Sequence, residues 1–130
     1  MNWEKIIRGS VIVASILAGI MIMGTMISIY GVVYTTCHEV RKIYGKDCVD
    51  SLILRLSDEN SSIREKNRAI WALGQFADKR ALSKLQALYT GHILQEKEPI
   101  DQVSQYELSK AIKWCQEGNI TSWLHRIINN

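Results

Sequence analysis

Apolar residues dominate the chain from Val11 to Tyr34, VIVASILAGIMIMGTMISIYGVVY, a stretch with no charged residue and no Pro. As a helix at about 1.5 Å per residue it would extend over roughly 36 Å, whereas the hydrocarbon core of a bilayer is about 30 Å thick. A buried core helix is one alternative, but the rest of so short a chain could not cover this stretch on every side. A signal peptide is another, but its apolar region is shorter, about 7–15 residues, and ends at a small-residue cleavage site. We therefore predict a transmembrane anchor over residues 1–36.

The residues within and beside this anchor agree with a membrane position. Trp3 precedes the apolar stretch, and Tyr30 and Tyr34 lie near its end. Amphipathic aromatic rings favour the headgroup level of a bilayer. Small residues recur every four positions in the stretch, a spacing that lets a second helix approach closely. The candidate helix-packing residues in the membrane are Ala14, Ser15, Ala18, Gly19, Gly24 and Ser28.

Residues 37–130 are expected to form a separate helical domain. The segment that follows the apolar stretch is polar and basic, TTCHEVRKIYGK, and should begin as a helix that stops at Gly45. The next helix has apolar residues at i, i+3, i+4 and i+7, which places them on one face. These residues are Val49, Leu52, Ile53 and Leu56, and the turn SDENSS follows them.

Capping residues predict where the later helices begin. Ser62 with Glu65, and Ser104 with Glu107, are capping boxes that each open a helix. Asp78 can cap a further helix between these two. The last short helix is expected to start at Thr121 or Ser122 and to end at Asn130.

Glycine and proline predict where helices stop. Residues 90–101 contain a Gly and the only Pro of the chain and should form a loop. Gly118 and Asn119 should close the helix that Ser104 opens. No segment alternates apolar and polar residues with period two over a useful length, so we expect no sheet. The predicted fold is all-α: one transmembrane helix, then a small helical-repeat domain of about two helix pairs.

The repeat is visible when the chain is shifted by 42 residues. Ser62 then falls on Ser104, Glu65 on Glu107, and the apolar pair at 69–70 on the pair at 111–112. A period near this value is typical of helical-pair repeats, which run to about 40–47 residues. The predicted repeat core consists of Leu52, Ile63, Ile70, Trp71, Leu73, Gly74, Phe76, Leu82 and Leu85.

The segment NRAIWALGQFADKRALSKLQAL resembles the bacterial HEAT-repeat family, also called PBS-lyase-like HEAT, whose repeats run R-x-x-A-x-x-A-L-G-x-x-G-D-x-R-A-L-x-x-L. The residues that match are Ala69, Ala72, Leu73, Gly74, Asp78, Arg80, Ala81, Leu82 and Leu85. The resemblance covers residues 48–88, is weak over 104–128 and is absent from the first 45. Ala77 stands where the family has Gly, so the turn there is expected to be less tight. Lys113 and Gln116 depart from the signature in the second unit, which could be a terminal cap.

Gly74 has a physical explanation that does not depend on this resemblance. A Gly within a helix costs about 1 kcal/mol relative to Ala. The residue makes sense where a neighbouring helix comes close to the backbone. Trp71 and Phe76 beside it are interpreted as core residues rather than as a cage for a ligand.

Charge does not indicate nucleic-acid binding. The net charge is +3, and acidic residues interrupt the basic ones. A solvated helix surface explains this pattern better than the basic stripe that a nucleic-acid binder carries. The nearest approach to such a stripe consists of Arg64, Lys66, Arg68, Lys79, Arg80 and Lys84.

The residues that could perform chemistry do not form a recognisable motif. Cys37, His38 and Cys48 are the closest metal-ligating group, but they lack the Cys-x-x-Cys or His-x-x-x-His spacing of structural zinc sites. His38 and Glu39 are interpreted as an interfacial polar pair. Cys115 is expected to behave as a small hydrophobic residue. We predict no metal, no cofactor and no catalytic residue.

The functional prediction is a membrane-anchored accessory or adaptor protein that binds partner proteins, expected to belong to a membrane complex. Repeat folds of this kind mostly bind proteins. The resemblance also extends to phycobilin lyase-like domains, so an enzyme is an alternative that fold-level analogy alone suggests. A binding module outside the cytoplasm is the other alternative.

The side of the membrane is predicted from charge and cysteine. Arg41, Lys42 and Lys46 follow the anchor and outnumber Lys5 and Arg8 before it. Basic residues favour the cytoplasmic side. The three Cys residues have no obvious pairing scheme, and unpaired thiols suit a reducing compartment. Both observations favour a domain on the cytoplasmic face of a bacterial inner membrane, although a first span often keeps a short N-terminal tail inside and exports the rest.

Overall fold

The computed structural model describes residues 2–91 and 101–129, and every regular element in these residues is a helix. The all-α prediction is confirmed. The chain divides into two units, Met1–Val32 and Val33–Asn130. The division lies close to the predicted boundary between residues 36 and 37, but it gives the second unit four more residues of the first helix.

The first unit consists of the N-terminal part of α1, a helix that runs from Trp3 to Tyr44. This helix is long and apolar enough to cross a membrane, with a mean hydropathy of 2.3 over its most apolar window. None of the side chains of that window is buried. The hydroxyl groups inside it are satisfied locally, since Ser15 donates to the Val11 carbonyl at 2.9 Å and Ser28 to the Gly24 carbonyl at 2.9 Å.

The second unit begins with the C-terminal part of α1, which is more than a connection. Val33, Thr36, Cys37 and Val40 are buried. Their i, i+3, i+4, i+7 spacing places them on one side of the helix. The helix stops where Gly45 takes a left-handed conformation at φ +68° and donates its N–H to the Arg41 carbonyl. The predicted stop is confirmed.

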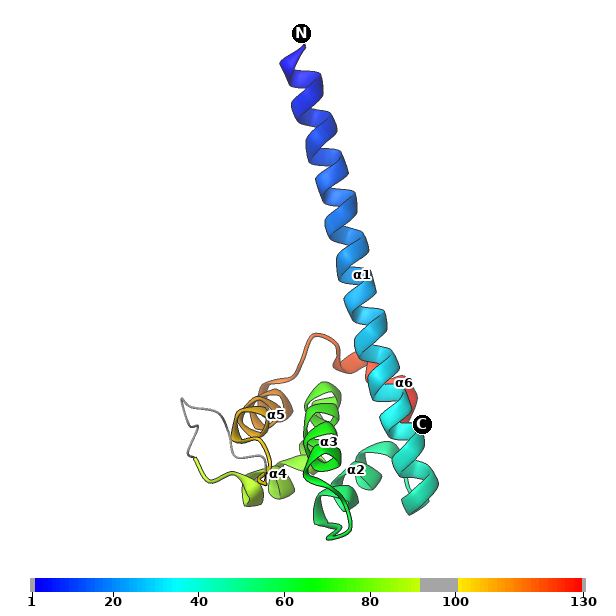
Figure 1. Cartoon of the computed structure of the whole chain (residues 1–130), viewed down its shortest axis with the longest axis vertical. Coiled ribbons are helices and arrows are strands. Elements are labelled where there is room, and N and C mark those ends of the chain that lie inside the picture. The colour runs from blue at the N-terminus through cyan, green and yellow to red at the C-terminus, as the bar shows by residue number, and fades with distance from the viewer. Residues whose placement is uncertain (1, 92–100, 130) are drawn as a thin grey trace. The chain divides into compact units, whose positions relative to one another are not determined.

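Among the described residues, the second unit also contains five further helices and one 3-10 turn. They are α2 (Cys48–Ser57), α3 (Ile63–Phe76), η1 (Lys79–Ala81), α4 (Leu82–Leu88), α5 (Gln105–Glu117) and α6 (Ser122–Asn129). Figure 1 shows α3 at the centre of this unit, with α2 on one side and α5 on the other. The part of the predicted loop at residues 92–100 lies outside the described residues.

The predicted capping box is confirmed at α3, whereas at α5 only its Ser104 half is present and the Ser104 N–H donates to Asn67 Oδ1 instead. Ser62 accepts from the Glu65 N–H at 3.3 Å, and the Glu65 carboxylate accepts from the Ser62 N–H at 2.7 Å. Ser104 accepts from the Glu107 N–H at 3.2 Å. Each bond satisfies a backbone group that the first turn of a helix leaves without an intrahelical partner.

The turn between α3 and α4 corrects one expectation. Ala77 adopts the left-handed conformation, φ 50° and ψ 41°, and donates its N–H to the Leu73 carbonyl. A tight turn is therefore kept without the Gly of the family pattern, at the steric cost of a Cβ atom in that region. Asp78 then accepts from the Arg80 N–H and opens η1, which leads into α4.

Most of the predicted repeat core is buried, with Gly74 at its closest helix contact. A Cβ atom on Gly74 would lie 3.0 Å from Trp114 Cε3 and 3.1 Å from Ala111 Cα. Ile63, Trp71 and Leu82 are half-buried rather than enclosed. The buried members are Leu52, Ile70, Leu73, Gly74, Phe76 and Leu85.

Candidate functional site

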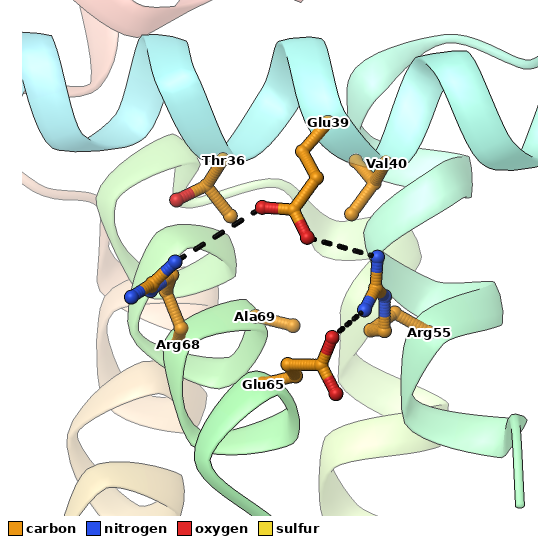
Figure 2. A pocket seen from close by; sticks show the side chains of 7 residues that line it. All are labelled: Thr36, Glu39, Val40, Arg55, Glu65, Arg68 and Ala69. Carbon is orange, nitrogen blue, oxygen red and sulfur yellow. Dashed lines mark hydrogen bonds and ion pairs between the residues drawn. The ribbon is translucent and has the colours of Figure 1, made fainter. Parts of the chain in front are cut away.

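A small pocket lies where the C-terminal part of α1 meets α2 and α3. Figure 2 shows its charged side chains converging from the three helices. Glu39 comes from α1, Arg55 from α2, and Glu65 and Arg68 from α3. The lining residues are Thr36, Glu39, Val40, Arg55, Glu65, Arg68 and Ala69.

Arg55 is the buried member of this group. Its side chain is 5% exposed, and its guanidinium lies 2.6 Å from a Glu65 oxygen and 3.5 Å from a Glu39 oxygen. It also lies over the Tyr44 ring, 5.7 Å from the centroid. A charge this deeply buried is stable only when it is paired, so the two carboxylates hold α1, α2 and α3 together around it. Nothing in the sequence singles out this residue, because a lone Arg between Leu54 and Leu56 looks like part of a solvated helix surface.

Glu65 has two roles that meet at one carboxylate. It closes the capping box of α3 through Ser62, and it accepts from Arg55. The hydrogen bonds from the Ser62 hydroxyl and N–H, and then the Arg55 charge, lower the pKa of Glu65 below its usual value. Glu65 is therefore ionised near neutral pH. The start of α3 is thereby linked to the charge in the pocket.

The pocket has too little room for a substrate. Its free volume is about 10 Å³, close to what one water molecule needs and far below the roughly 300–1,000 Å³ of a small-molecule site. The Arg55 charge is already neutralised by the two carboxylates that line the pocket with it. We interpret the cluster as an internal brace.

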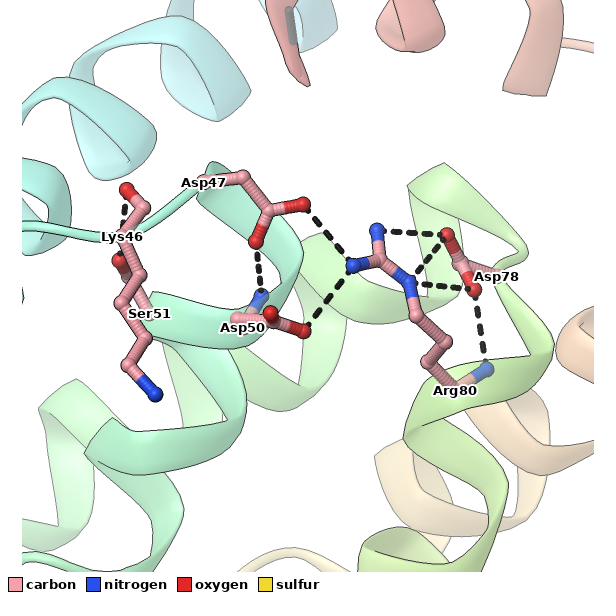
Figure 3. A network of polar contacts seen from close by, with 6 residues as sticks. All are labelled: Lys46, Asp47, Asp50, Ser51, Asp78 and Arg80. Carbon is pink, nitrogen blue, oxygen red and sulfur yellow. Dashed lines mark hydrogen bonds and ion pairs between the residues drawn. The ribbon is translucent and has the colours of Figure 1, made fainter.

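A second ionic cluster joins the α2 end of the unit to the start of α4. Figure 3 shows Arg80 between Asp78 on one side and Asp47 with Asp50 on the other. Its guanidinium lies 2.9 Å from Asp47, 3.0 Å from Asp50 and 3.1 Å from Asp78. The bond to Asp78, and then the other carboxylates, raises the pKa of Arg80 against the opposing effect of burial. Arg80 is thus an anchor between elements rather than part of a basic stripe.

Cys37 and Cys48 form a disulfide, with their Cα atoms 5.2 Å apart. The expectation of three unpaired thiols is therefore wrong for two of them, and the group of Cys37, His38 and Cys48 is not a metal site. The bond ties α1 to the first residue of α2 across the turn at Gly45. Among the described residues, no group of three or more His, Cys, Asp and Glu side chains is arranged to hold a metal ion.

The remaining thiol, Cys115, is buried as expected. Its Sγ–H donates to the Leu73 carbonyl at 3.7 Å, across the contact between α5 and α3. Burial raises its pKa to about 11. A thiol that stays protonated at neutral pH is a poor nucleophile, so Cys115 is a packing residue.

Two histidines lie differently from what the sequence indicated. His38 stacks on Tyr34 with ring centroids 6.5 Å apart, while Glu39 pairs with Arg55 and Arg68. The predicted polar pair of His38 with Glu39 is therefore wrong. His125 is completely buried and meets the Phe76 ring edge-on at 5.9 Å. Burial lowers its pKa.

An exposed aromatic surface lies on α5. Lys110 Nζ lies 5.0 Å from the Tyr106 ring centroid and 5.1 Å from the Trp114 ring centroid. Tyr106 is exposed and Trp114 half-buried, so the three side chains form a continuous stack open to solvent on one side. We call this set of Tyr106, Lys110 and Trp114 the α5 surface.

The candidate helix-packing residues of α1 all lie on exposed turns of the first unit. Nothing lies within 4 Å of where a Cβ atom of Gly19 or Gly24 would be. Space for a second helix is therefore open at both glycines. The full set is Ala14, Ser15, Ala18, Gly19, Gly24 and Ser28.

Comparison with known protein families, with curated proteins and with solved structures finds no match to this chain.

Proposed function

We propose that this chain is a single-pass membrane protein of a bacterium, whose helical unit binds partner proteins outside the cytoplasm. The apolar part of α1 supports the span, because its most apolar window has a mean hydropathy of 2.3 and no buried side chain. An apolar helix that long is stable in lipid and is a liability in water.

The disulfide between Cys37 and Cys48 is the main reason for placing the helical unit outside the cytoplasm. Such bonds persist in oxidising compartments and are rare in the cytoplasm. Cys37 follows Tyr34, the end of the apolar stretch, by three positions. We therefore favour the exported orientation over the cytoplasmic one that the basic residues after the span indicated.

A binding role is supported by the way the unit is built. The bonds of Ser62 and Ser104 to residues three positions later recur 42 residues apart, and α3 and α5, the helices they open, pack on each other. This agrees with the HEAT-like resemblance, and helical repeats of that kind mostly bind proteins. The charged side chains around Arg55 and Arg80 already pair with one another and hold the helices together, so we do not assign partner binding to them.

The α5 surface is the binding surface that we propose. Trp, Tyr and Arg contribute most of the binding energy at protein interfaces, and the α5 surface presents a Tyr and a Trp side by side. Lys110 holds both rings in place before a partner arrives. Binding would then cost little side-chain entropy.

The orientation is tested by labelling an added thiol on the surface. Glu59→Cys places a thiol in the exposed turn between α2 and α3, while the native Cys115 is buried. In intact spheroplasts, a membrane-impermeant maleimide should label this variant before lysis and should not label the unaltered chain. Labelling only after lysis would mean that the unit lies in the cytoplasm and would contradict the exported orientation.

The binding surface is tested by photo-crosslinking in cells. A photoreactive residue at the exposed Lys113, next to the α5 surface, should give a discrete adduct, and one at Glu59 should not. Tyr106→Ala should remove that adduct while leaving the melting temperature unchanged, because Tyr106 is exposed. An adduct that persists in Tyr106→Ala would exclude the α5 surface as the binding site.

A further inference from the structure

The disulfide between Cys37 and Cys48 is enclosed within the second unit. Cys37 is 1% exposed and Cys48 is 0% exposed. Cys37 lies on the buried side of α1 with Val33 and Val40, and Cys48 is the first residue of α2. A probe of the size of water hardly touches either residue. A larger molecule therefore cannot reach the two sulfur atoms while these helices are in place.

Several contacts hold the C-terminal part of α1 where it covers the bond. Glu39 pairs with Arg55 of α2 at 3.5 Å. Tyr44 donates from its hydroxyl to Asp58, the C-cap of α2, at 2.6 Å. Arg41 donates to a carbonyl of α6 at 3.2 Å. Because these contacts join α1 to different helices, the sulfur atoms become accessible only when the second unit opens.

The chemistry of a disulfide needs direct access to sulfur. A thiolate attacks one sulfur atom of the bond and forms a mixed disulfide with it. In the folded unit neither Cys37 nor Cys48 is open to an attacking group. Formation of the bond by exchange follows the same route in reverse. Both making and breaking the bond are therefore confined to the open chain.

The open chain favours this pairing over a bond to Cys115. Cys37 and Cys48 are 11 positions apart, whereas Cys115 lies about six times farther from Cys48 along the chain. The probability of closing a flexible loop falls with about the three-halves power of its length, so the shorter loop closes roughly 15 times more readily. The observed pair therefore needs no folded template.

We propose that the bond between Cys37 and Cys48 forms in the open chain, by exchange with a disulfide donor, and is enclosed when α1 closes on α2 and α3. One cysteine thiolate attacks the donor's disulfide, and the donor's other sulfur leaves as a thiolate. The second cysteine thiolate then displaces the donor from the mixed disulfide. In total the two cysteines lose two electrons and two protons, and the donor gains them as two thiols. Only the supply of a donor rests on the exported orientation of the proposed function.

The rate of reduction in the full-length protein tests the enclosure. The oxidised chain in detergent is treated with excess dithiothreitol, samples are quenched with acid, and free thiols are counted by gel mobility after reaction with a polyethylene-glycol maleimide. Reduction in native buffer should be at least about a hundredfold slower than in strong urea, because only the small open fraction reacts. A smaller difference would overturn the enclosure.

A remote variant separates opening of the unit from local exposure of the bond. Gly74→Ala changes the contact of α3 with α5, away from the disulfide. Its reduction rate in native buffer should rise by the same factor as the open fraction that urea unfolding gives for it. Arg64→Ala, on the exposed side of α3, is the matched control. A reduction rate that does not follow the open fraction would assign reduction to a local movement and overturn the requirement for opening.

The pairing in the open chain is tested without any folded unit. The reduced full-length chain in strong urea is oxidised with glutathione disulfide, and the bonds are identified by peptide mapping. The bond between Cys37 and Cys48 should exceed each bond to Cys115 by roughly tenfold. Comparable amounts of the three pairings would mean that the fold selects the pair and would overturn the proposed order of events. These measurements use purified protein, so their outcome is independent of the side of the membrane.

Discussion

Gly74 of α3 lies against the backbone of Ala111 in α5, so closely that a Cβ atom at position 74 would be 3.1 Å from Ala111 Cα. This contact brings together two positions 37 residues apart, and the Cys115 thiol reaches the Leu73 carbonyl beside it. The absence of a side chain at Gly74 sets the distance between the two helices. A Cβ atom at this position would require the neighbouring helix or the Trp114 side chain to move by a few tenths of an ångström.

The first prediction concerns this contact. Gly74→Ala should destabilise the second unit by about 1–3 kcal/mol through overpacking, although Ala favours a helix by about 1 kcal/mol over Gly. The measurement is urea unfolding in detergent followed by tryptophan fluorescence. Arg64→Ala, on the exposed side of the same helix, is the control and should change little. An unchanged or raised stability of Gly74→Ala would show that α5 can move away.

The second prediction separates the two roles of Glu65. Ser62→Ala removes the side-chain cap of α3 and should cost about 1 kcal/mol. Glu65→Ala removes the reciprocal cap and also leaves buried Arg55 with Glu39 alone at 3.5 Å, so it should cost clearly more. Both variants are compared by urea unfolding. Equal losses would mean that the Arg55 pair contributes nothing beyond the cap.

The third prediction concerns acid sensitivity. Burial lowers the pKa of His125 below 6.5 in the folded chain, so the unfolded chain binds more protons between the two values. Stability from the neutral form is complete above about pH 6.5 and is lost as the pH falls toward the folded pKa. His125→Gln should therefore flatten the dependence of melting temperature on pH between about 5 and 7. A dependence that stays as steep in His125→Gln would assign the loss of stability in acid to other groups.

The fourth prediction concerns the disulfide. Cys37 and Cys48 are 11 positions apart, and a loop of that size loses roughly 2–3 kcal/mol when the bond is removed. Cys48→Ser should lower the stability by this amount in urea unfolding. Reduction of the unaltered chain should do the same and should have no further effect on Cys48→Ser. A reductant effect of similar size in Cys48→Ser would mean that the loss comes from elsewhere.

Local signals in the sequence predicted the helix ends well. Ser62, Ser104, Gly45 and Gly118 act on backbone groups within four positions of themselves, so their effect is readable without the rest of the fold. Gly118 ends α5 with a positive φ of 92° and donates its N–H to the Trp114 carbonyl. The long apolar stretch of α1 was equally readable, because its signal is length and composition.

Features that depend on three-dimensional proximity were missed. The disulfide needs the turn at Gly45 to bring Cys37 back to Cys48, and nothing in their spacing reveals it. Arg55 and His125 are polar residues on sides of helices that become inward only when α1, α2, α3 and α6 assemble. In α6, Ile127 is exposed to solvent while His125 is buried. A pattern of hydrophobicity alone would place the two the other way round.

The proposed function requires a helical unit that matures outside the cytoplasm with Cys37 bonded to Cys48. Protein taken directly from cells into acid, then denatured and treated with a polyethylene-glycol maleimide, reports its free thiols by gel mobility. The chain has three Cys residues, of which only Cys115 is free in the structure. One added polymer before reduction and three after it is the predicted result. Three added polymers without any reduction would contradict the account and restore the cytoplasmic placement.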